Sequence, residues 1–535
     1  MQRAIAADPP RNDNWLVKTA SRVKTDAPTA IDWIGTFATA LLLVLSFPNF
    51  NFPFLAWFAL VPFLFVVSRR PSPLRAFILG WAFGSTFFYA TCYWLTYSMI
   101  HYGGLPAPLA YLLLVPGALV VGLFPALFAL LTAISIKRWG TNALLLAPIF
   151  WATCEWFRLG VTGQLWNALG YSQAEVFGGI LIQAARWGGV YAVGFLILAV
   201  SSSLTLAAIS RRPKQVAIAA VVILVTCGIT IGSGSSDSNS PSGIPPDLYV
   251  VALQPNVPMT MVKTVEEMNA LRDRHLSMSI QALQSLPVDN IPRLVVWPES
   301  PMNFTYASDH TFQELVSKFT RENHTSLLLN SLEPAPGEGA YNSAILINEE
   351  GRLISQYDKI RLLPFGEYVP LPQWLGGSLI SGMVGDFTPG NRYTVMPVGS
   401  HRVGVFICIE SAYPSIARTQ TAEGADVLIN ISNDGYLGPT AVMRQHLANA
   451  IFRGVENGRP LLSVTNSGLS AKIRPDGFVD DITTGFQPDV RIWKVGRQLI
   501  NSTFYTAHGD LFVQLCTVLS VILFVAAVYR RKRSS

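Results

Sequence analysis

The chain has 535 residues, of which 50% are hydrophobic and only 13% are charged. A soluble protein of this length carries about a quarter charged residues, so the composition favours a polytopic membrane protein. The formal net charge of +6 would suit a nucleic-acid partner. That partner is excluded, because the Lys and Arg residues gather at the ends of apolar segments.

Eight apolar runs predict membrane-spanning helices, since about 20 residues are needed to cross roughly 30 Å of hydrocarbon. The runs cover residues 31–48, 54–68, 76–100, 107–135, 142–157, 190–210, 214–232 and 511–529. The second and fifth runs are short for a full crossing, and a tilted or interfacial helix is the alternative for each. Seven spans is therefore the alternative to eight.

Basic residues predict the orientation of these spans. If the N-terminus is cytoplasmic, every loop on that side is basic, whereas the connections 49–53 and 101–106 contain no Lys or Arg. The C-terminal tail 530–535 is also basic, which requires an even number of spans and favours eight. The polar region between the seventh and eighth spans then lies outside the cytoplasm. The first 30 residues lack an apolar core, so we expect a cytoplasmic tail followed by a retained anchor.

A Gly/Ser/Pro-rich linker at 233–246 separates the spans at 31–232 from a polar domain at 247–500. Short Val-, Ile- and Leu-rich runs predict strands buried on both faces, and they alternate with amphipathic stretches, which indicates a layered α/β domain. The predicted strands are 248–253, 294–297, 326–329, 343–347, 403–408, 427–431 and 461–464. The predicted helices are 265–286, 311–321, 412–423 and 440–457.

Cys408 is the candidate nucleophile of this domain. The chain has 5 cysteines, and the other four lie in the predicted spans, where cysteine usually serves as a small packing residue. Cys408 ends a predicted strand, and active-site groups of α/β domains gather at the carboxyl ends of strands. The alternative is a buried structural thiol.

A thiol nucleophile needs a base and a group that stabilises the oxyanion. The segment VVWPESP (295–301) places Glu299 after a buried strand, and YDKIRLLPFGEYVP (357–370) carries Lys359 and Glu367. The alternative for each residue alone is a solvated charge at the end of an apolar run. A Cys–His pair with His446 or His401 is a further alternative. The 7 His residues lack the spacing of metal ligands, so we expect no metal site.

The order of Glu299, Lys359 and Cys408 resembles the Glu-Lys-Cys triad of the nitrilase superfamily. Further blocks resemble the apolipoprotein N-acyltransferase family: residues 78–106 and 162–173 in the spans, and LQPNVP (253–258), WPES (297–300), CIES (408–411) and residues 433–468 in the domain. The resemblance implies an α-β-β-α domain inserted into a polytopic α-helical membrane protein. It also implies Glu299 as general base, Lys359 as oxyanion stabiliser, Cys408 as nucleophile, and Glu367 and Glu410 as supporting residues.

The resemblance further implies the reaction and the location. An acyl chain would pass from a membrane phospholipid to Cys408 as a thioester, and then to the α-amino group of the N-terminal diacylglyceryl-cysteine of an apolipoprotein, without a cofactor. The enzyme would lie in the bacterial inner membrane with its domain in the periplasm. Ile409 and Tyr436 depart from residues common in the family, which affects the expected pocket around the nucleophile.

Residues 372–387 (PQWLGGSLISGMVGDF) are apolar, Gly-rich and free of positive charge. They predict a lid that dips into the membrane interface, and an ordinary packed loop is the alternative. The predicted lid or substrate contacts are Trp374, Leu375, Met383, Phe387 and, outside this segment, Tyr436.

Two other functions stay open at this point. The first is a membrane-anchored amidase that hydrolyses a small amide, although eight spans are superfluous for a water-soluble substrate. The second is a non-catalytic scaffold or transporter, for which Glu155 is the main ionisable residue within a span.

Overall fold

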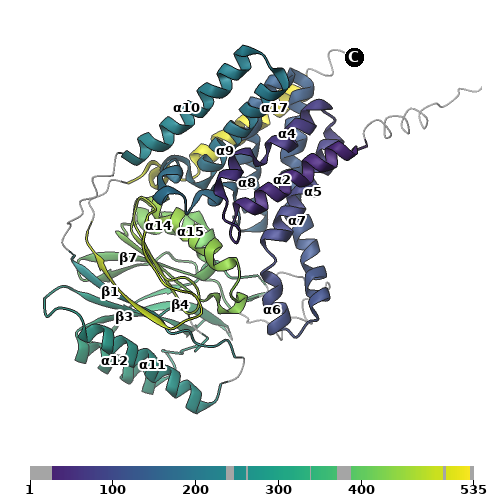
Figure 1. Cartoon of the computed structure of the whole chain (residues 1–535). Helices are drawn as coiled ribbons and strands as arrows, with labels where there is room; N and C mark the ends of the chain where they lie inside the picture. The colour runs from purple at the N-terminus through teal and green to yellow at the C-terminus, as the bar shows by residue number, and fades with distance from the viewer. Residues whose placement is uncertain are drawn as a thin grey trace, which may run out of the picture.

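The computed structural model describes residues 27–235, 246–260, 263–299, 301–337, 339–364, 366–369, 387–497 and 502–529. They form a helical bundle, here called the membrane bundle, and an α/β domain packed against one end of it (Figure 1). The bundle consists of α2 (Ala30–Ser46), η1 (Pro53–Leu55), α3 (Ala56–Ala59), α4 (Val61–Arg69), α5 (Pro73–Thr91), α6 (Leu95–His101), α7 (Ala107–Trp139), η2 (Thr141–Leu146), α8 (Ala147–Thr162), η3 (Leu169–Gln173), η4 (Phe177–Ile182), α9 (Ala185–Ser210), α10 (Pro213–Ser235) and α17 (Leu511–Tyr529).

Among the described residues, 5 helical stretches are long and apolar enough to cross a membrane: Ala107–Trp139, Thr141–Thr162, Ala185–Ser210, Pro213–Thr230 and Leu511–Tyr529. Two further apolar stretches, Ala30–Ser46 and Pro53–Arg69, are shorter. All eight predicted runs contain helix, and the prediction of a helical membrane protein is confirmed. The exact number of spans stays a prediction.

The predicted run 76–100 is interrupted in the structure. Helix α5 ends at Thr91, and the short helix α6 begins at Leu95. In a continuous helix the Thr91 carbonyl would accept the Leu95 N–H, but here Leu95 N–H bonds to Cys92 O (3.1 Å) and Gln445 Nε2 bonds to Thr91 O (2.9 Å). A side chain from the α/β domain therefore replaces the helical partner.

Helix α7 has 33 residues, so it is about 50 Å long at 1.5 Å per residue. That length exceeds the roughly 30 Å of bilayer hydrocarbon. The N-terminal end of α7 and the adjoining α6 extend alongside the α/β domain (Figure 1). The bundle thus supplies an arm that reaches the domain.

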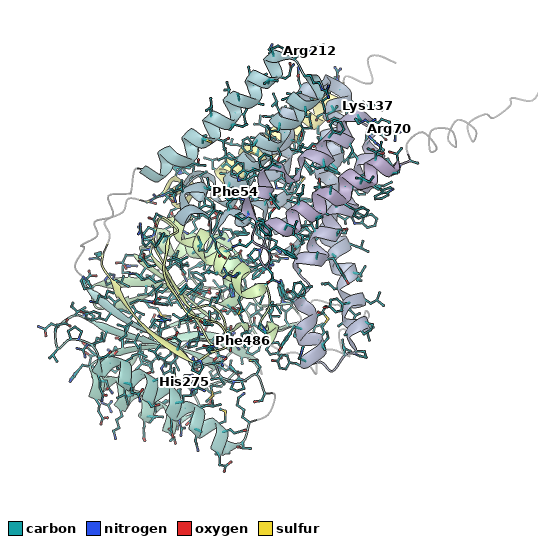
Figure 2. All side chains as sticks on the ribbon, viewed as in Figure 1. Phe54, Arg70, Lys137, Arg212, His275 and Phe486 are labelled. Atoms are coloured by element: carbon teal, nitrogen blue, oxygen red, sulfur yellow. The ribbon has the colours of Figure 1, made fainter. Side chains whose placement is uncertain are left out.

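Basic residues at the ends of several helices gather at one end of the bundle. Arg70, Lys137 and Arg212 occupy the end that is remote from the α/β domain, in which His275 and Phe486 are marked (Figure 2). At the same end Asp32 pairs with Arg70 (3.2 Å) and with Arg75 (2.8 Å).

The α/β domain contains two six-stranded sheets, with strand orders β12-β1-β2-β3-β4-β5 and β11-β10-β9-β8-β7-β6. The first sheet comprises β1 (Leu248–Gln254), β2 (Arg293–Val296), β3 (Ser326–Pro334), β4 (Ala340–Ile347), β5 (Leu353–Asp358) and β12 (Asp489–Val495). The second comprises β6 (Val395–Val398), β7 (His401–Ile407), β8 (Val427–Ser432), β9 (Leu461–Thr465), β10 (Ala471–Ile473) and β11 (Val479–Ile482). Parallel pairing of β1-β2-β3 and of β7-β8-β9 forms the centre of each sheet.

The sheets pack face to face with helices on both outer faces. Along β1, Leu248, Val250 and Ala252 enter the core between the sheets, and the alternate residues pack beneath α11 (Val265–Gln284) and α12 (His310–Asn323). The other sheet is covered by η7 (Cys408–Ala412), α14 (Pro414–Ala422), η8 (Asp434–Leu437) and α15 (Val442–Asn457), while α16 (Phe504–His508) leads back into the bundle. The predicted α-β-β-α layering is confirmed.

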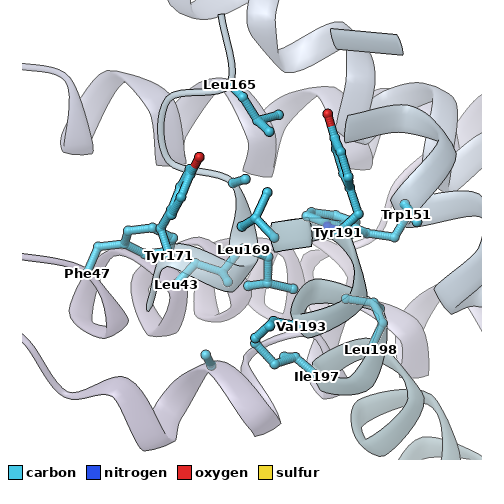
Figure 3. Packing of buried hydrophobic residues seen from close by; sticks show 14 of the residues in the cluster. Leu43, Phe47, Trp151, Leu165, Leu169, Tyr171, Tyr191, Val193, Ile197 and Leu198 are labelled. Atoms are coloured by element: carbon cyan, nitrogen blue, oxygen red, sulfur yellow. The ribbon is translucent and has the colours of Figure 1, made fainter. Parts of the chain in front are cut away.

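One hydrophobic core runs from the bundle into the α14–α15 layer. Its bundle part packs Leu169 and Tyr171 of η3 against α9 (Figure 3). Tyr171 then contacts the ring of Phe452 on α15 edge-on at 5.0 Å. Glu155, the ionisable residue singled out within a span, is buried and accepts the Leu169 N–H at 2.7 Å, so it fixes this loop.

Candidate active site

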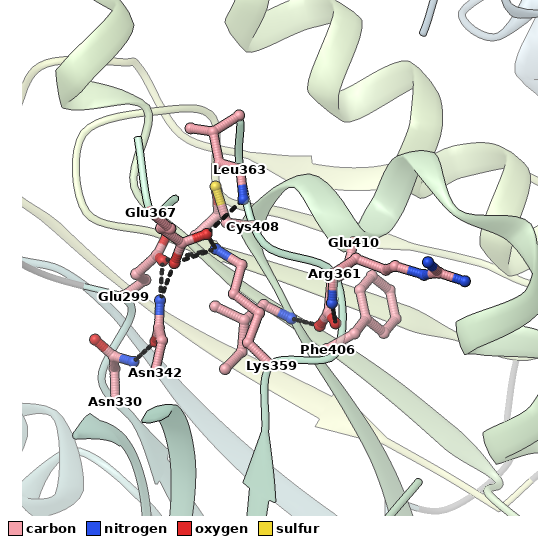
Figure 4. A network of polar contacts seen from close by, with 12 residues as sticks. Glu299, Asn330, Asn342, Lys359, Arg361, Leu363, Glu367, Phe406, Cys408 and Glu410 are labelled. Atoms are coloured by element: carbon pink, nitrogen blue, oxygen red, sulfur yellow. Dashed lines mark hydrogen bonds and ion pairs between the residues drawn. The ribbon is translucent and has the colours of Figure 1, made fainter. Parts of the chain in front are cut away.

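Three strand ends bring the predicted triad together. Glu299 follows β2, Lys359 follows β5 directly, and Cys408 follows β7 directly. Figure 4 shows the Lys359 amine between the carboxylates of Glu299 and Glu367, with the Cys408 sulfur beside this group. The α-β-β-α layering makes this meeting possible, because β5 and β7 belong to opposite sheets.

Lys359 is 1% exposed and forms two ion pairs. Its Nζ lies 3.3 Å from Glu299 Oε1 and 2.9 Å from the Glu367 carboxylate. Burial alone would lower the pKa of Lys359, but Glu299 and Glu367 outweigh it and hold the pKa well above its usual value. The amine is therefore a permanent cation in the site.

Asn342, on β4, organises the two carboxylates, and sequence reasoning missed it. Its Nδ2 donates to Glu299 Oε1 (3.0 Å) and Glu367 Oε1 (2.7 Å), and its Oδ1 accepts from Asn330 Nδ2 (2.7 Å). Glu367 also accepts the Leu363 N–H at 2.7 Å. The signal available in the sequence was a polar residue directly before the predicted strand 343–347.

Cys408 is held in a backbone conformation that favours glycine, with φ of 54°. Burial is the main cause that raises the pKa of its thiol well above the usual value, and the negative charge of Glu299 adds to it, while Lys359 opposes both. At rest Cys408, the candidate nucleophile, therefore favours the protonated thiol. It needs a base, and Glu299 is the neighbouring carboxylate with the stronger effect on it.

Replacing Glu299 with glutamine removes a negative charge beside Cys408 while Lys359 stays. The pKa of the thiol is therefore expected to fall, and the pH profile of Cys408 alkylation by iodoacetamide moves to lower pH. Acylation by a lipid ester is nevertheless expected to fall about 100-fold or more, because the candidate base is lost. Alkylation is read by peptide mass against the Cys408→Ala background, and an unchanged or upward-shifted profile contradicts the assignment.

Glu410 is fully buried and acts on the backbone. Its carboxylate accepts the N–H groups of Ile360 (2.8 Å), Arg361 (3.0 Å) and Ile407 (2.8 Å), and the Tyr357 hydroxyl. Burial raises its pKa to about 7, against these hydrogen bonds. Glu410 thus ties the strand end before Cys408 to the segment after Lys359, and does not itself bond to the Lys359 amine.

The two His alternatives are placed differently. His446 Nε2 donates to the Cys408 carbonyl oxygen at 2.8 Å, and its Nδ1 faces Asp434 Oδ1 at 2.9 Å. The hydrogen bond of His446 with Cys408 is therefore to the backbone carbonyl and not to the sulfur. His401 lies at the other end of β7, between Asp247 (2.7 Å) and Asp426 (3.1 Å).

His401 is expected to make the stability of the α/β domain depend on pH. Burial lowers its pKa, but Asp426 and Asp247 outweigh this and raise the pKa above 6.5. A raised His pKa stabilises the folded state below the unfolded value and loses this contribution as pH rises through the folded value. The apparent thermal midpoint is expected to fall as pH rises from about 6.5 through the raised pKa of the folded state. His401→Gln is expected to reduce this fall. Equal pH dependence in both proteins contradicts the prediction.

The predicted lid residues Trp374, Leu375 and Met383 lie outside the described residues. Phe387 is described, and its N–H donates to Glu367 O at 3.2 Å. Tyr436, in η8, packs its ring 5.0 Å from that of Tyr102, beyond α6. Tyr102 also donates to Gly435 O (3.3 Å), so Tyr436 lies where the arm of the bundle meets the domain.

Comparisons with known proteins match both parts of the chain. Residues 39–203 match the apolipoprotein N-acyltransferase N-terminal domain, and residues 253–503 match the carbon-nitrogen hydrolase family. An apolipoprotein N-acyltransferase of Geobacter metallireducens is 32% identical over 95% of this chain and 97% of its own length. One of Azotobacter vinelandii is 31% identical over 79% of this chain and 81% of its own length. Among solved structures, an amidase of the nitrilase superfamily from Nesterenkonia AN1 is 17% identical, covers 50% of this chain and 97% of its own, and has a TM-score of 0.37.

Together, the two-sheet domain, the helical bundle and the matched families define a membrane-embedded acyltransferase with a nitrilase-like domain. Within that class, the Geobacter metallireducens enzyme, which matches nearly the whole chain, identifies the family. The chain belongs to the apolipoprotein N-acyltransferase family.

Proposed function

We propose that this enzyme moves an acyl chain from a membrane phospholipid to the α-amino group of an apolipoprotein's N-terminal diacylglyceryl-cysteine. The observation that carries the proposal is the Lys359 amine, bonded to both Glu299 and Glu367 beside the Cys408 sulfur. The relatives named apolipoprotein N-acyltransferase support the substrate class. No cofactor is needed for this chemistry, because the three side chains supply base, cation and nucleophile.

The first half-reaction acylates Cys408. Glu299 takes the thiol proton, and the thiolate attacks the ester carbonyl carbon of the phospholipid. Lys359 stabilises the oxyanion, which is usually the largest single contribution in acyl transfer. The carbon–oxygen bond then breaks, Glu299 protonates the leaving glycerol oxygen, and a lysophospholipid departs from the thioester.

The second half-reaction transfers the acyl group to nitrogen. The acceptor amine attacks the thioester carbonyl, Glu299 takes a proton from that amine, and Lys359 again stabilises the oxyanion. The carbon–sulfur bond breaks, and the thiolate recovers its proton from Glu299. A thioester reacts more readily with an amine than the original oxygen ester does, so the intermediate favours the amide product.

The membrane bundle suits lipid-anchored substrates. Moving acyl chains from the bilayer into water would cost about 0.8 kcal/mol for each CH₂ group, and a site that is held at the bilayer surface avoids this cost. We further propose that the bundle lies in the inner membrane. The end of the bundle remote from the α/β domain, with Arg70, Lys137 and Arg212, then faces the cytoplasm. The α/β domain at 247–500 then faces the periplasm.

The test is an acyl adduct on the purified full-length chain. After incubation with phospholipid vesicles, intact mass is expected to show one added acyl group that neutral hydroxylamine removes. A synthetic diacylated lipopeptide with a free α-amine is then expected to clear the adduct and to become triacylated. Absence of the adduct contradicts the proposal, and clearance by water at the same rate favours the hydrolase alternative.

A further inference from the structure

The nucleophile has a backbone conformation that must be held by its surroundings. A residue with a Cβ disfavours the positive φ of 54° at Cys408. Two donors fix the carbonyl group of Cys408: His446 Nε2 at 2.8 Å and Asn430 Nδ2 at 3.3 Å. The direction of the sulfur therefore depends on how firmly these two side chains are held.

His446 is fixed by its own partners. Asp434 accepts from Nδ1 at 2.9 Å, and the imidazole is buried with the ring of Trp166 at 5.8 Å. Trp166 belongs to the membrane bundle, where its carbonyl accepts from Arg158 Nη1 at 2.8 Å. The bundle thus contacts the α/β domain at His446, the residue that bonds to the Cys408 carbonyl.

Among the described residues, the side-chain amide of Gln445, the residue before His446, bonds to the bundle alone. Its Oε1 accepts from the indole N–H of Trp166 (2.7 Å) and of Trp94 (3.0 Å). Its Nε2 donates to Thr91 O (2.9 Å) and to Pro48 O (3.3 Å). Three separate segments of the bundle therefore converge on one buried side chain of α15.

We propose that Gln445 and His446 are positioning residues through which the membrane bundle orients Cys408. Gln445 fixes the start of α15 against the bundle. His446, the next residue of the same helix, holds the Cys408 carbonyl by a hydrogen bond. Neither side chain touches the reacting atoms. The proposal rests on the proposed function, since it concerns the same thiol. It gives the bundle a second role, in addition to holding the site at the bilayer surface.

The full-length chain offers a matched pair of variants. Gln445→Leu removes the four hydrogen bonds near the nucleophile. Gln183→Leu is the control, because Gln183 is equally buried and also bridges bundle and domain, donating to Gly179 O (2.8 Å) and Asp476 O (2.7 Å), away from Cys408. Trp94→Phe is a milder second variant that removes one donor to Gln445 and keeps an aromatic ring.

Two readouts separate positioning from folding. Gln445→Leu is expected to lower the maximal single-turnover rate of Cys408 acylation about 10- to 100-fold, without changing the half-saturating phospholipid concentration. Trp94→Phe is expected to change the rate in the same direction by less. Gln183→Leu is expected to lower the apparent thermal midpoint as Gln445→Leu does, with the acylation rate unchanged. Equal acylation rates in Gln445→Leu and Gln183→Leu overturn the proposal.

A second pair tests His446 itself. His446→Gln keeps an N–H donor that can face the Cys408 carbonyl and is expected to retain more activity than His446→Leu. Equal loss in both variants counts against the positioning role. Alkylation of Cys408 by iodoacetamide needs no lipid, so it reports on the thiol even if the wild type forms no acyl adduct. An alkylation rate in Gln445→Leu that equals that of the wild type overturns the coupling, independently of the proposed function.

Discussion

Cys408→Ala is expected to abolish the hydroxylamine-sensitive acyl adduct and to lower lipopeptide acylation by about four orders of magnitude or more, since losing the nucleophile of a triad has an effect of at least this size. Intact mass and triacylated product measure the two effects. The variant keeps the positive φ of the position and the hydrogen bonds to its carbonyl, so little change of fold is expected.

The matched control is Cys227→Ala, because Cys227 is an exposed thiol on α10. It is expected to acylate as the wild type does. Cys408→Ser adds a chemical distinction: an acyl-serine, if it forms, is an oxygen ester and resists neutral hydroxylamine. An adduct that persists in Cys408→Ala and is still removed by hydroxylamine would assign the nucleophile elsewhere.

The sequence predicted the strands that are buried on both faces. Seven apolar runs became β1, β2, β3, β4, β7, β8 and β9. The other five strands, β5, β6, β10, β11 and β12, were missed. They are short or half-exposed, as in β5, where Leu353 and Ile354 are solvent-exposed. Such strands owe their pairing to neighbours in the sheet, and a pattern of apolar residues cannot reveal that.

Some residues of the candidate site could likewise be predicted from local sequence patterns, and others could not. Strand ends indicated Glu299 and Cys408, because the carboxyl ends of strands gather functional groups. Lys359 follows β5, which was not predicted, so only the resemblance to the nitrilase triad joined it to them. The contacts of Asn342, Gln445 and His446 depend on residues that are distant in sequence. The break between α5 and α6 has the same origin, since the Thr91 carbonyl bonds to Gln445, 354 positions further on. Local patterns carry no trace of such bonds.

Lys359→Met is the second change with a large expected effect, and it acts in two ways. It leaves Glu299 and Glu367 without their shared cation in a buried site, and breaking such a pair typically costs about 3–5 kcal/mol of stability. It also removes the proposed oxyanion stabiliser, and losing such a group typically costs about 100- to 1,000-fold in rate. The single variant is therefore expected to be both less stable and nearly inactive.

The double variant Lys359→Met/Glu367→Gln separates these two effects. Glu367 lies 2.9 Å from the Lys359 amine, and replacing it with the neutral amide removes one of the two carboxylates that the methionine leaves uncompensated. The apparent thermal midpoint is expected to recover towards that of the wild type. Acyl-adduct formation is expected to stay at the level of the single variant, because no cation faces the developing oxyanion. Recovery of adduct formation together with stability would mean that Lys359 only maintains the fold around Cys408 and that another group stabilises the oxyanion.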